Sequence, residues 1–518
     1  MTPHDTHPRG RTLPGKTLVA TLLTGALLLT GCGGERSNTS AGAPEFKVNT
    51  PAEIARASAD NYDDNVNGLI TGRTLKRWID DWEANRPAGI TGNLVIIQAS
   101  TGPTDYRFIK PNNQNVFTYL ETSWRESRSN GVTEIAGIVI GGPRTDALVR
   151  RYGIDVHNDL IVCAQGNAAS GSYFNQGRCW YTFRYWGVDH RNLAVLDGGN
   201  RFLSGDWTTD DFTDQDFSAA ISNQPSPIIN RQVSTVRDLK VDNTALQATL
   251  EDMINALPTR DENNLTDGVF LWDGRSLEQF SAGETSEAGG ALPNRLNSFQ
   301  NNATRQGHPR GSVNLNWENL IDTATGLFKS KADVRAYLNG EVDGNGKGFR
   351  DGTLQHLGAG NAYQEGDVVY LWCETSARAA VTTIATALIL GLPTRLYDAA
   401  TIEWNSLSGG VEDRDGVLVL PADSPWRTDV LSEPYYLNEP ARIAPRNAWS
   451  DTENPAATSS PRIIDPYAER TNLVILEDQA YKGIGQDDDD TGNGGGNGNG
   501  GGNGGGGGGV VLPPNPCG

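Results

Sequence analysis

The chain has 518 residues, of which 63 are acidic and 43 are basic, and its formal net charge at pH 7 is −20. This balance argues against nucleic-acid binding, which needs a basic surface, and means that an anionic substrate needs a local basic patch. The length is a soft prior for about three domains, although two enlarged domains with tails fit the sequence better.

The N-terminal segment predicts export and membrane attachment. Basic residues precede an apolar stretch at 18–29, and residues 29–32 (LTGC) look like a bacterial lipobox. The stretch is too short to span a bilayer, so we expect residues 1–31 to be a cleaved signal peptide and Cys32 to carry a lipid. An ordinary secretory signal is the alternative. We expect the protein in the cell envelope, lipid-anchored at the outer membrane, on its periplasmic or outer side.

In the first half of the chain, residues 160–163 (LIVC) predict a buried strand. A loop follows, then a helix that Gly187 ends, and residues 193–199 (LAVLDGG) predict the next strand and turn. Cys163 is expected to be a buried strand residue that could form a disulfide with Cys179 if the geometry allows. A second reactive cysteine is the alternative reading of Cys163.

The second half repeats this plan around Cys373. The apolar run at 368–372 (VVYLW) predicts a buried strand, and a helix is expected from 377 to 390, ended by Gly391. A thiol in the loop between them would lie over a helix N-terminus, where the partial positive charge favours the thiolate. This arrangement occurs at several kinds of thiolate site, phosphatases included, and a packed structural cysteine is the alternative.

Four further segments accompany Cys373 in order: 271–278 (LWDGRSLE), 307–314 (GHPRGSVN), 326–330 (GLFKS) and 396–404 (LYDAATIEW). Together they resemble the catalytic half of a two-domain rhodanese, the thiosulfate and mercaptopyruvate sulfurtransferase family. The first half resembles the non-catalytic domain of that family. The resemblance implies an α/β fold with tandem rhodanese-like domains, each a mainly parallel sheet flanked by helices.

The expected domain plan has six parts. The C-terminal extension, residues 411–485, carries a strand-like run at 473–476. We expect it to wrap the two domains or to meet a partner. The tail contains an acidic run and a Gly/Asn-rich tract that cannot bury a core, so we expect disorder, with a calcium site as the alternative. The parts are the signal peptide 1–31, a linker 32–60, the non-catalytic domain 61–225, the catalytic domain 226–410, the extension 411–485 and the tail 486–518.

The resemblance also implies roles for single residues. Cys373 would be the catalytic nucleophile, and the cation of Arg378 would orient an anionic donor. Ser376 stands where the family usually has Gly, and Glu374 places a negative charge beside the sulfur. Alignment with the family makes Ala164 the first-half counterpart of Cys373. The remaining loop residues expected at the substrate are Thr375 and Ala377, and those expected to brace the loop are Asp273, Arg275 and His308.

The function that follows is sulfur transfer through a persulfide on Cys373, from a small sulfur donor to a thiol acceptor, without a cofactor. Selenium or tellurium oxyanions are further candidate substrates. Rhodanese-like lipoproteins of this kind resemble components of selenite or tellurite reduction systems and of extracellular electron conduits. The alternative is a non-catalytic module that docks on an outer-membrane complex. The histidines are scattered, so no metal site is expected. Cys517 is left without an assigned partner.

Overall fold

A computed structural model describes twelve stretches of the chain. The expected signal peptide, Cys32 and the tail with Cys517 lie outside them. The described residues are 46–100, 107–112, 114–167, 172–213, 234–259, 267–281, 286–287, 290–291, 307–358, 362–407, 420–433 and 462–484.

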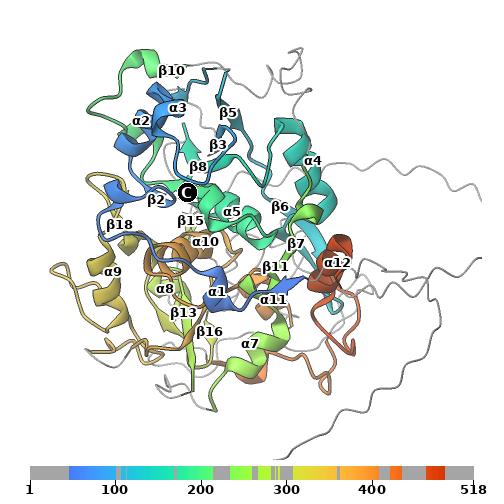
Figure 1. The fold of residues 1–518 in the computed structure, drawn as a ribbon. Helices are drawn as coiled ribbons and strands as arrows, with labels where there is room; N and C mark the ends of the chain where they lie inside the picture. Colours follow the sequence, from blue (N-terminus) through green and yellow to red (C-terminus); the bar gives the residue numbers. More distant parts are fainter. Residues whose placement is uncertain are drawn as a thin grey trace, which may run out of the picture. The chain divides into compact units, whose positions relative to one another are not determined.

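The first half forms a five-stranded parallel sheet (Figure 1). Its central strands are mostly apolar and are buried along their whole length, as expected for a parallel sheet covered on both faces. The strand order is β2-β9-β8-β3-β5, with bounds β2 (Gly68–Ile70), β9 (Leu193–Leu196), β8 (Leu160–Gly166), β3 (Leu94–Ser100) and β5 (Val116–Leu120).

The second half forms another five-stranded parallel sheet with the same topology. In both sheets the first strand along the chain lies at one edge and the third at the other. The predicted α/β class with parallel sheets is therefore confirmed, and the matching strand order makes the two halves structural repeats. The order is β12-β21-β20-β13-β17, with bounds β12 (Gln247–Ala248), β21 (Thr394–Tyr397), β20 (Val368–Trp372), β13 (Val269–Asp273) and β17 (Val313–Asn314).

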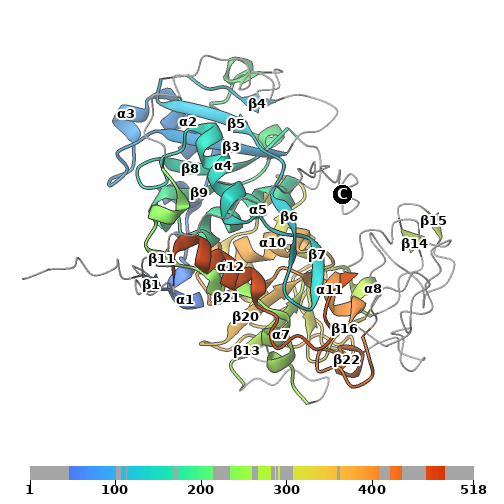
Figure 2. The same ribbon diagram turned by 90° about the vertical axis from the view of Figure 1, so that its right-hand side faces the viewer.

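Helices flank both sheets, and short strands pair outside them (Figures 1 and 2). The helices are α1 (Pro51–Ile54), α2 (Gly72–Asp80), α3 (Trp82–Asn85), α4 (Gly142–Tyr152), α5 (Ser172–Tyr185), α7 (Leu250–Ala256), α8 (Leu277–Phe280), α9 (Lys331–Leu338), α10 (Ala377–Thr383), α11 (Ala400–Ser406) and α12 (Leu473–Lys482). The paired strands include β1 (Lys47–Val48) with β11 (Val241–Asp242), β4 (Phe108–Ile109) with β10 (Phe212–Thr213), β16 (His308–Pro309) with β22 (Ser432–Glu433), and β18 (Ile321–Asp322) with β19 (Leu327–Phe328).

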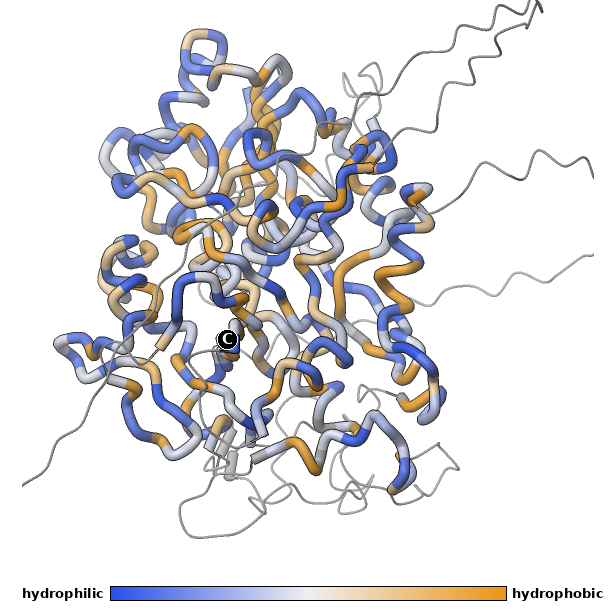
Figure 3. The backbone as a smooth tube through the Cα atoms, turned by 60° about the horizontal axis from the view of Figure 1, so that its bottom comes forward, coloured by the Kyte–Doolittle hydropathy of each residue, from blue (hydrophilic) through white to orange (hydrophobic). Residues whose placement is uncertain are grey.

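The two halves share one hydrophobic core. Helix α5 of the first half packs against α10 of the second, and side chains of both sheets belong to the same buried cluster. The helices approach closely because Gly177 has no side chain: a Cβ there would lie 2.6 Å from the carbonyl oxygen of Ala380. Several of the outer loops are hydrophilic (Figure 3). The contact between α5 and α10 therefore holds the loop that precedes α10, which contains Cys373, against the first half.

Helix α10 continues without a break as the π-helical segment η10 (Ile384–Leu390), which ends at Gly391 in the left-handed conformation with φ 70°. The sequence predicted this helix end, because glycine adopts positive φ without a steric penalty. Two helical segments of seven residues each thus connect the Cys373 loop to the far end of the second sheet.

The predicted strand at 473–476 is wrong, because these residues begin helix α12. A run of four apolar residues fits either element, and the buried positions Val474, Asp478 and Lys482 follow helical spacing. Strand β23 (Arg462–Ile463), also in the extension, pairs with β7 (Thr133–Val139) of the first half. The described part of the extension also meets the second half, where Glu251 N donates to the Thr471 hydroxyl at 3.1 Å.

Candidate functional site

Cys373 lies at the carboxyl end of β20, the central strand of the second sheet. Val369, Leu371 and Cys373 alternate onto the face that joins the shared core, and each has no exposed surface. Among the described cysteines, Cys373 is the free thiol. The carboxyl end of a parallel sheet is where α/β proteins usually bind ligands. The thiol is therefore in a reactive position, but it is closed off in this conformation.

The loop after Cys373 is held by the segment that follows the next strand. The carbonyl oxygen of Cys373 accepts from Thr401 N at 3.1 Å, and the carbonyl oxygen of Glu374 accepts from Ile402 N at 3.2 Å. Ser376, the N-cap of α10, has φ 62°, a left-handed conformation that costs a non-glycine residue about 1–2 kcal/mol. Its hydroxyl donates to the carbonyl oxygens of Tyr397, at 3.3 Å, and Asp398. These hydrogen bonds offset part of the strain, so they hold Ser376 in its left-handed conformation.

Charges in the loop are matched internally. Arg378 Nη2 donates to Glu374 Oε2 at 3.0 Å, and Arg378 Nη1 donates to Gln279 Oε1 at 2.7 Å. Glu374 is fully buried and Arg378 is buried. The sequence predicted that Arg378 would face an anionic donor and that Glu374 would oppose it. In the structure the two neutralise each other, so a donor meets a pair without net charge.

Of the residues expected to brace the loop, Asp273 and Arg275 lie at the end of β13, the strand next to β20, and His308 lies in β16. Arg275 Nε donates to Asp273 Oδ1 at 3.0 Å, both side chains are buried, and Gly274 N donates to the Trp372 carbonyl oxygen at 3.0 Å. His308 packs its ring on Phe280 with centroids 3.8 Å apart, and its Nδ1 lies 2.9 Å from the Phe280 carbonyl oxygen. The contacts of Asp273, Gly274 and Arg275 fix the end of β13 on one side of Cys373, and His308 packs on the end of α8.

Thr375 and Ala377 are the remaining residues expected at the substrate. Thr375 is half-buried, and Ala377 is buried and is the first residue of α10, so its backbone N–H belongs to the turn that begins the helix.

A buried ion pair connects the loop to the first half of the molecule. Arg178 of α5 binds both carboxylate oxygens of Asp398, one of them at 3.2 Å, and Asp398 also accepts from Val139 N at 2.7 Å. The backbone of Asp398 in turn accepts from Ser376. The first half therefore contacts the loop segment through the Asp398 carboxylate, and no local sequence pattern predicts this pairing.

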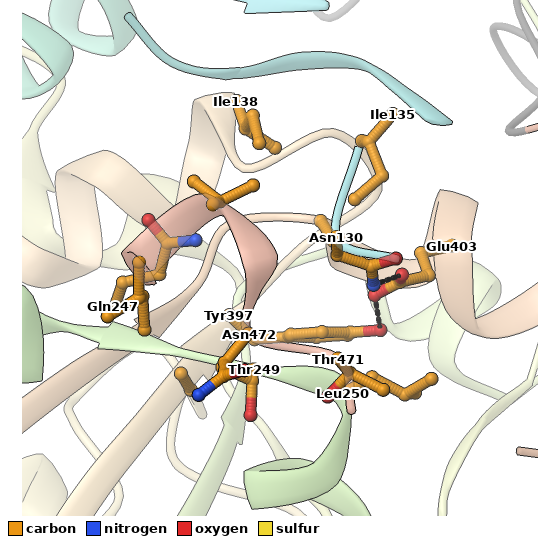
Figure 4. Close-up of a pocket in the computed structure, with 14 residues that line it drawn as sticks. Asn130, Ile135, Ile138, Gln247, Thr249, Leu250, Tyr397, Glu403, Thr471 and Asn472 are labelled. Carbon is orange, nitrogen blue, oxygen red and sulfur yellow. Dashed lines mark hydrogen bonds between the residues drawn. The ribbon is translucent and has the colours of Figure 1, made fainter. Parts of the chain in front are cut away.

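Glu403 is a second such contact, and it borders a small cavity (Figure 4). Its fully buried carboxylate accepts from Asn130, from the Thr133 hydroxyl at 2.7 Å and from the Tyr397 hydroxyl at 2.6 Å. Burial raises the pKa of Glu403, and the three donors oppose that rise. Asn130 and Thr133 belong to the hairpin of β6 (Arg125–Ser129) and β7. Glu403 thus fastens this hairpin of the first half to α11, whose first turn holds the Cys373 loop.

The first half carries a different set of residues at the equivalent place. Cys163 and Cys179 form a disulfide that joins β8 to α5, with Cα atoms 6.0 Å apart. A disulfide-bonded Cys163 is not available as a second nucleophile. The strand register corrects the sequence alignment by one residue: Cys163 lies beside Val195 as Leu371 lies beside Leu396. The counterpart of Cys373 is therefore the buried Gln165, and Ala164 corresponds to Trp372.

Among the described residues, no group of three or more His, Cys, Asp or Glu side chains is placed to hold a metal ion. No helix in the same part of the chain is long and apolar enough to cross a membrane.

Comparison with known proteins gives matches to solved structures. No protein-family model and no curated protein sequence matches the chain. The Tum1 protein of Saccharomyces cerevisiae is 14% identical over 66% of this chain and 95% of its own, with a TM-score of 0.45. SseA of Escherichia coli, a 3-mercaptopyruvate sulfotransferase described as having the "rhodanese" fold, is 14% identical over 64% and 98%, with a TM-score of 0.40. The 3-mercaptopyruvate sulfurtransferase of Leishmania major is 11% identical over 66% and 74%, with a TM-score of 0.35. Similarity at this level assigns no residue role to this chain.

Proposed function

We propose that this protein is a rhodanese-type sulfurtransferase that carries sulfane sulfur on Cys373. The observation that carries the proposal is the position of a free thiol at the carboxyl end of the central strand, four residues before a helix, inside the ordered set of rhodanese-like motifs. The first half repeats the topology with Gln165 in that position. Only the second half therefore offers the thiol chemistry.

The proposed reaction has two steps. The Cys373 thiolate attacks the sulfane sulfur of thiosulfate, a bond forms between the two sulfurs, and the bond to the sulfite group breaks with its electron pair leaving on sulfite. An acceptor thiolate or cyanide then attacks the outer sulfur of the persulfide and restores the Cys373 thiolate. The N-terminal turn of α10 would stabilise the negative charge on either sulfur.

A non-catalytic docking module is the second candidate function. Two observations favour it. Burial of Cys373 limits access of a donor to the thiol, and the neutral Glu374–Arg378 pair does not attract an anionic donor. The proposed partner is an outer-membrane complex, such as an electron conduit. Attachment through a lipid on Cys32 belongs to both candidates.

Persulfide loading separates the two functions. The purified protein is incubated with thiosulfate or 3-mercaptopyruvate, its intact mass is measured, and cyanide is added to follow thiocyanate release. We expect the gain of one sulfur atom in the wild type and in Cys517→Ser, which is the matched control, and no gain in Cys373→Ser. Cys163 and Cys179 do not compete while they are disulfide-bonded. If no donor loads the wild type, the docking module stands and sulfur transfer falls.

A variant of this assay tests selenium and tellurium oxyanions as substrates. Selenite and tellurite replace the sulfur donor, with a thiol as the reductant, and loss of the metalloid is followed over time. Turnover that persists in Cys373→Ser excludes Cys373 from that chemistry.

A further inference from the structure

A shallow recess, partly open to solvent, lies at the amino-terminal edge of the first sheet. Gly68 and Leu193 line it, and they are the first residues of β2 and β9. This edge is opposite to the edge that carries Gln165. Leu388 of η10 lines the other side, so the recess lies between the two halves. It is separate from the Cys373 loop.

Three basic side chains, those of Arg56, Arg184 and His190, line this recess together with Asn67 and Trp180. Such a concentration is unexpected in a chain whose net charge is −20. Arg56 is exposed and His190 is half-buried, whereas Arg184 is only 5% exposed. The recess thus has a buried cation at its base and two accessible basic groups above it.

The charge of Arg184 is not matched by a carboxylate. Its Nε and Nη2 donate to the Ile54 carbonyl oxygen at 3.0 and 2.9 Å, and its Nη1 donates to the Val188 carbonyl oxygen at 2.9 Å. Within the described residues, no acidic side chain forms an ion pair with Arg184 or Arg56. Neutral carbonyls satisfy part of the hydrogen-bonding capacity of the guanidinium, but they leave its full positive charge buried, which is unfavourable without a counter-ion. Burial accordingly lowers the pKa of Arg184 to about 10, although the charge of Asp189 opposes this shift without forming an ion pair with Arg184.

Asp189, the neighbour of His190 in the chain, already pairs with other basic groups. Asp189 lies 3.2 Å from His190 Nδ1 and 3.1 Å from Arg191 Nε, and these contacts lower its pKa. His190 has a pKa below its ordinary value, chiefly because it is desolvated; the field of Asp189 raises it, and the positive charges of Arg184, Arg56 and Arg191 lower it. The cations therefore interact with one another across this recess.

We propose that the recess binds a small inorganic anion, held by Arg56, Arg184 and His190. Arginine provides five N–H donors, of which Arg184 uses three on carbonyls, so its remaining donors and those of the exposed Arg56 can converge on an anion. Protonated His190 adds a third charge. The bound anion neutralises the buried guanidinium and stabilises the junction, where Arg56 N donates to the Ala387 carbonyl oxygen at 2.9 Å.

Calorimetric titration with sodium sulfate, thiosulfate or chloride at constant ionic strength tests the proposal on the full chain. We expect saturable binding with one site per chain. Arg56→Ala removes an exposed side chain without disturbing the core, and loss of one charge-assisted contact should weaken binding about tenfold or more. The control Arg73→Ala removes another largely exposed arginine, paired with Asp63, away from the recess, and should bind like the wild type.

The three anions separate oxyanion binding from halide binding. Binding should tighten as the pH falls below the ordinary pKa of histidine, about 6.5, because the lowered pKa of His190 places its protonation on that side, and His190→Ala should abolish this dependence. Cys373→Ser should bind sulfate unchanged, which makes the result independent of sulfur transfer. The absence of saturable binding by all three anions, or equal affinities in Arg56→Ala and wild type, would overturn the proposal.

Discussion

Replacing Glu374 by Gln should convert the Cys373 loop from a neutral site to a cationic one. Gln retains an oxygen that can accept from Arg378 Nη2, now 3.0 Å from the carboxylate, but it removes the negative charge. The guanidinium would then attract an anionic donor that the pair in the wild type does not attract. We expect higher kcat/KM for anionic donors, mainly through a lower KM.

The size of the gain follows from Coulomb's law. Two unit charges 4 Å apart interact by about 1 kcal/mol in water and about 4 kcal/mol at the effective dielectric constant near a protein surface. Taking the lower value, doubly charged thiosulfate gains about 2 kcal/mol, or roughly 30-fold in kcat/KM, and 3-mercaptopyruvate, with one carboxylate charge, gains about 1 kcal/mol, or roughly fivefold. A larger gain in kcat/KM for thiosulfate than for 3-mercaptopyruvate would show that the effect is electrostatic.

The same change should cost stability, because removing one partner of a buried ion pair costs about 3–5 kcal/mol. Kinetics are therefore measured below the unfolding transition, with circular dichroism as the check on folding. The control Glu278→Gln makes the same charge change at an exposed position beside Gln279 and should leave kcat/KM unchanged. Equal gains for both donors, or none in a folded Glu374→Gln protein, would refute the electrostatic reasoning.

Three further predictions concern a buried ion pair, the pH dependence of stability and membrane attachment. Arg178→Met should destabilise the fold by about 3–5 kcal/mol in urea unfolding, and by much less in an Asp398→Asn background, where no buried carboxylate is left unpaired. Burial raises the pKa of Asp197 to about 7, so the folded state binds more protons than the unfolded chain and stability falls as the pH rises from about 4 to about 7. In Asp197→Asn this fall should be reduced in urea unfolding compared between about pH 5 and about pH 8, and an unchanged profile would contradict the assignment. Cys32→Ser should abolish lipid processing and release the chain from membranes; a variant that stays bound after a salt wash would show that a protein partner, not a lipid, is the main anchor.

The sequence by itself determined the features that local patterns encode. The apolar runs at 160–163 and 368–372 each mark a strand, and the helix after Cys373 ends at Gly391 as its glycine predicted. Because both halves repeat the strand–loop–helix plan, the parallel α/β class and the place of Cys373 followed from the order of these segments. Short-range steric and hydrophobic preferences suffice for such predictions.

Tertiary structure alone decided which residues meet. The run at 473–476 became a helix because packing against the first half selected helical spacing, which four apolar residues cannot specify. The counterpart of Cys373 is Gln165 because neighbouring strands, not the local sequence, set the register. Arg178 and Asp398 are 220 residues apart along the chain, and no local pattern predicts that they pair. Such distant ion pairs depend on tertiary structure, because the two charges come together and are buried only once the chain has folded.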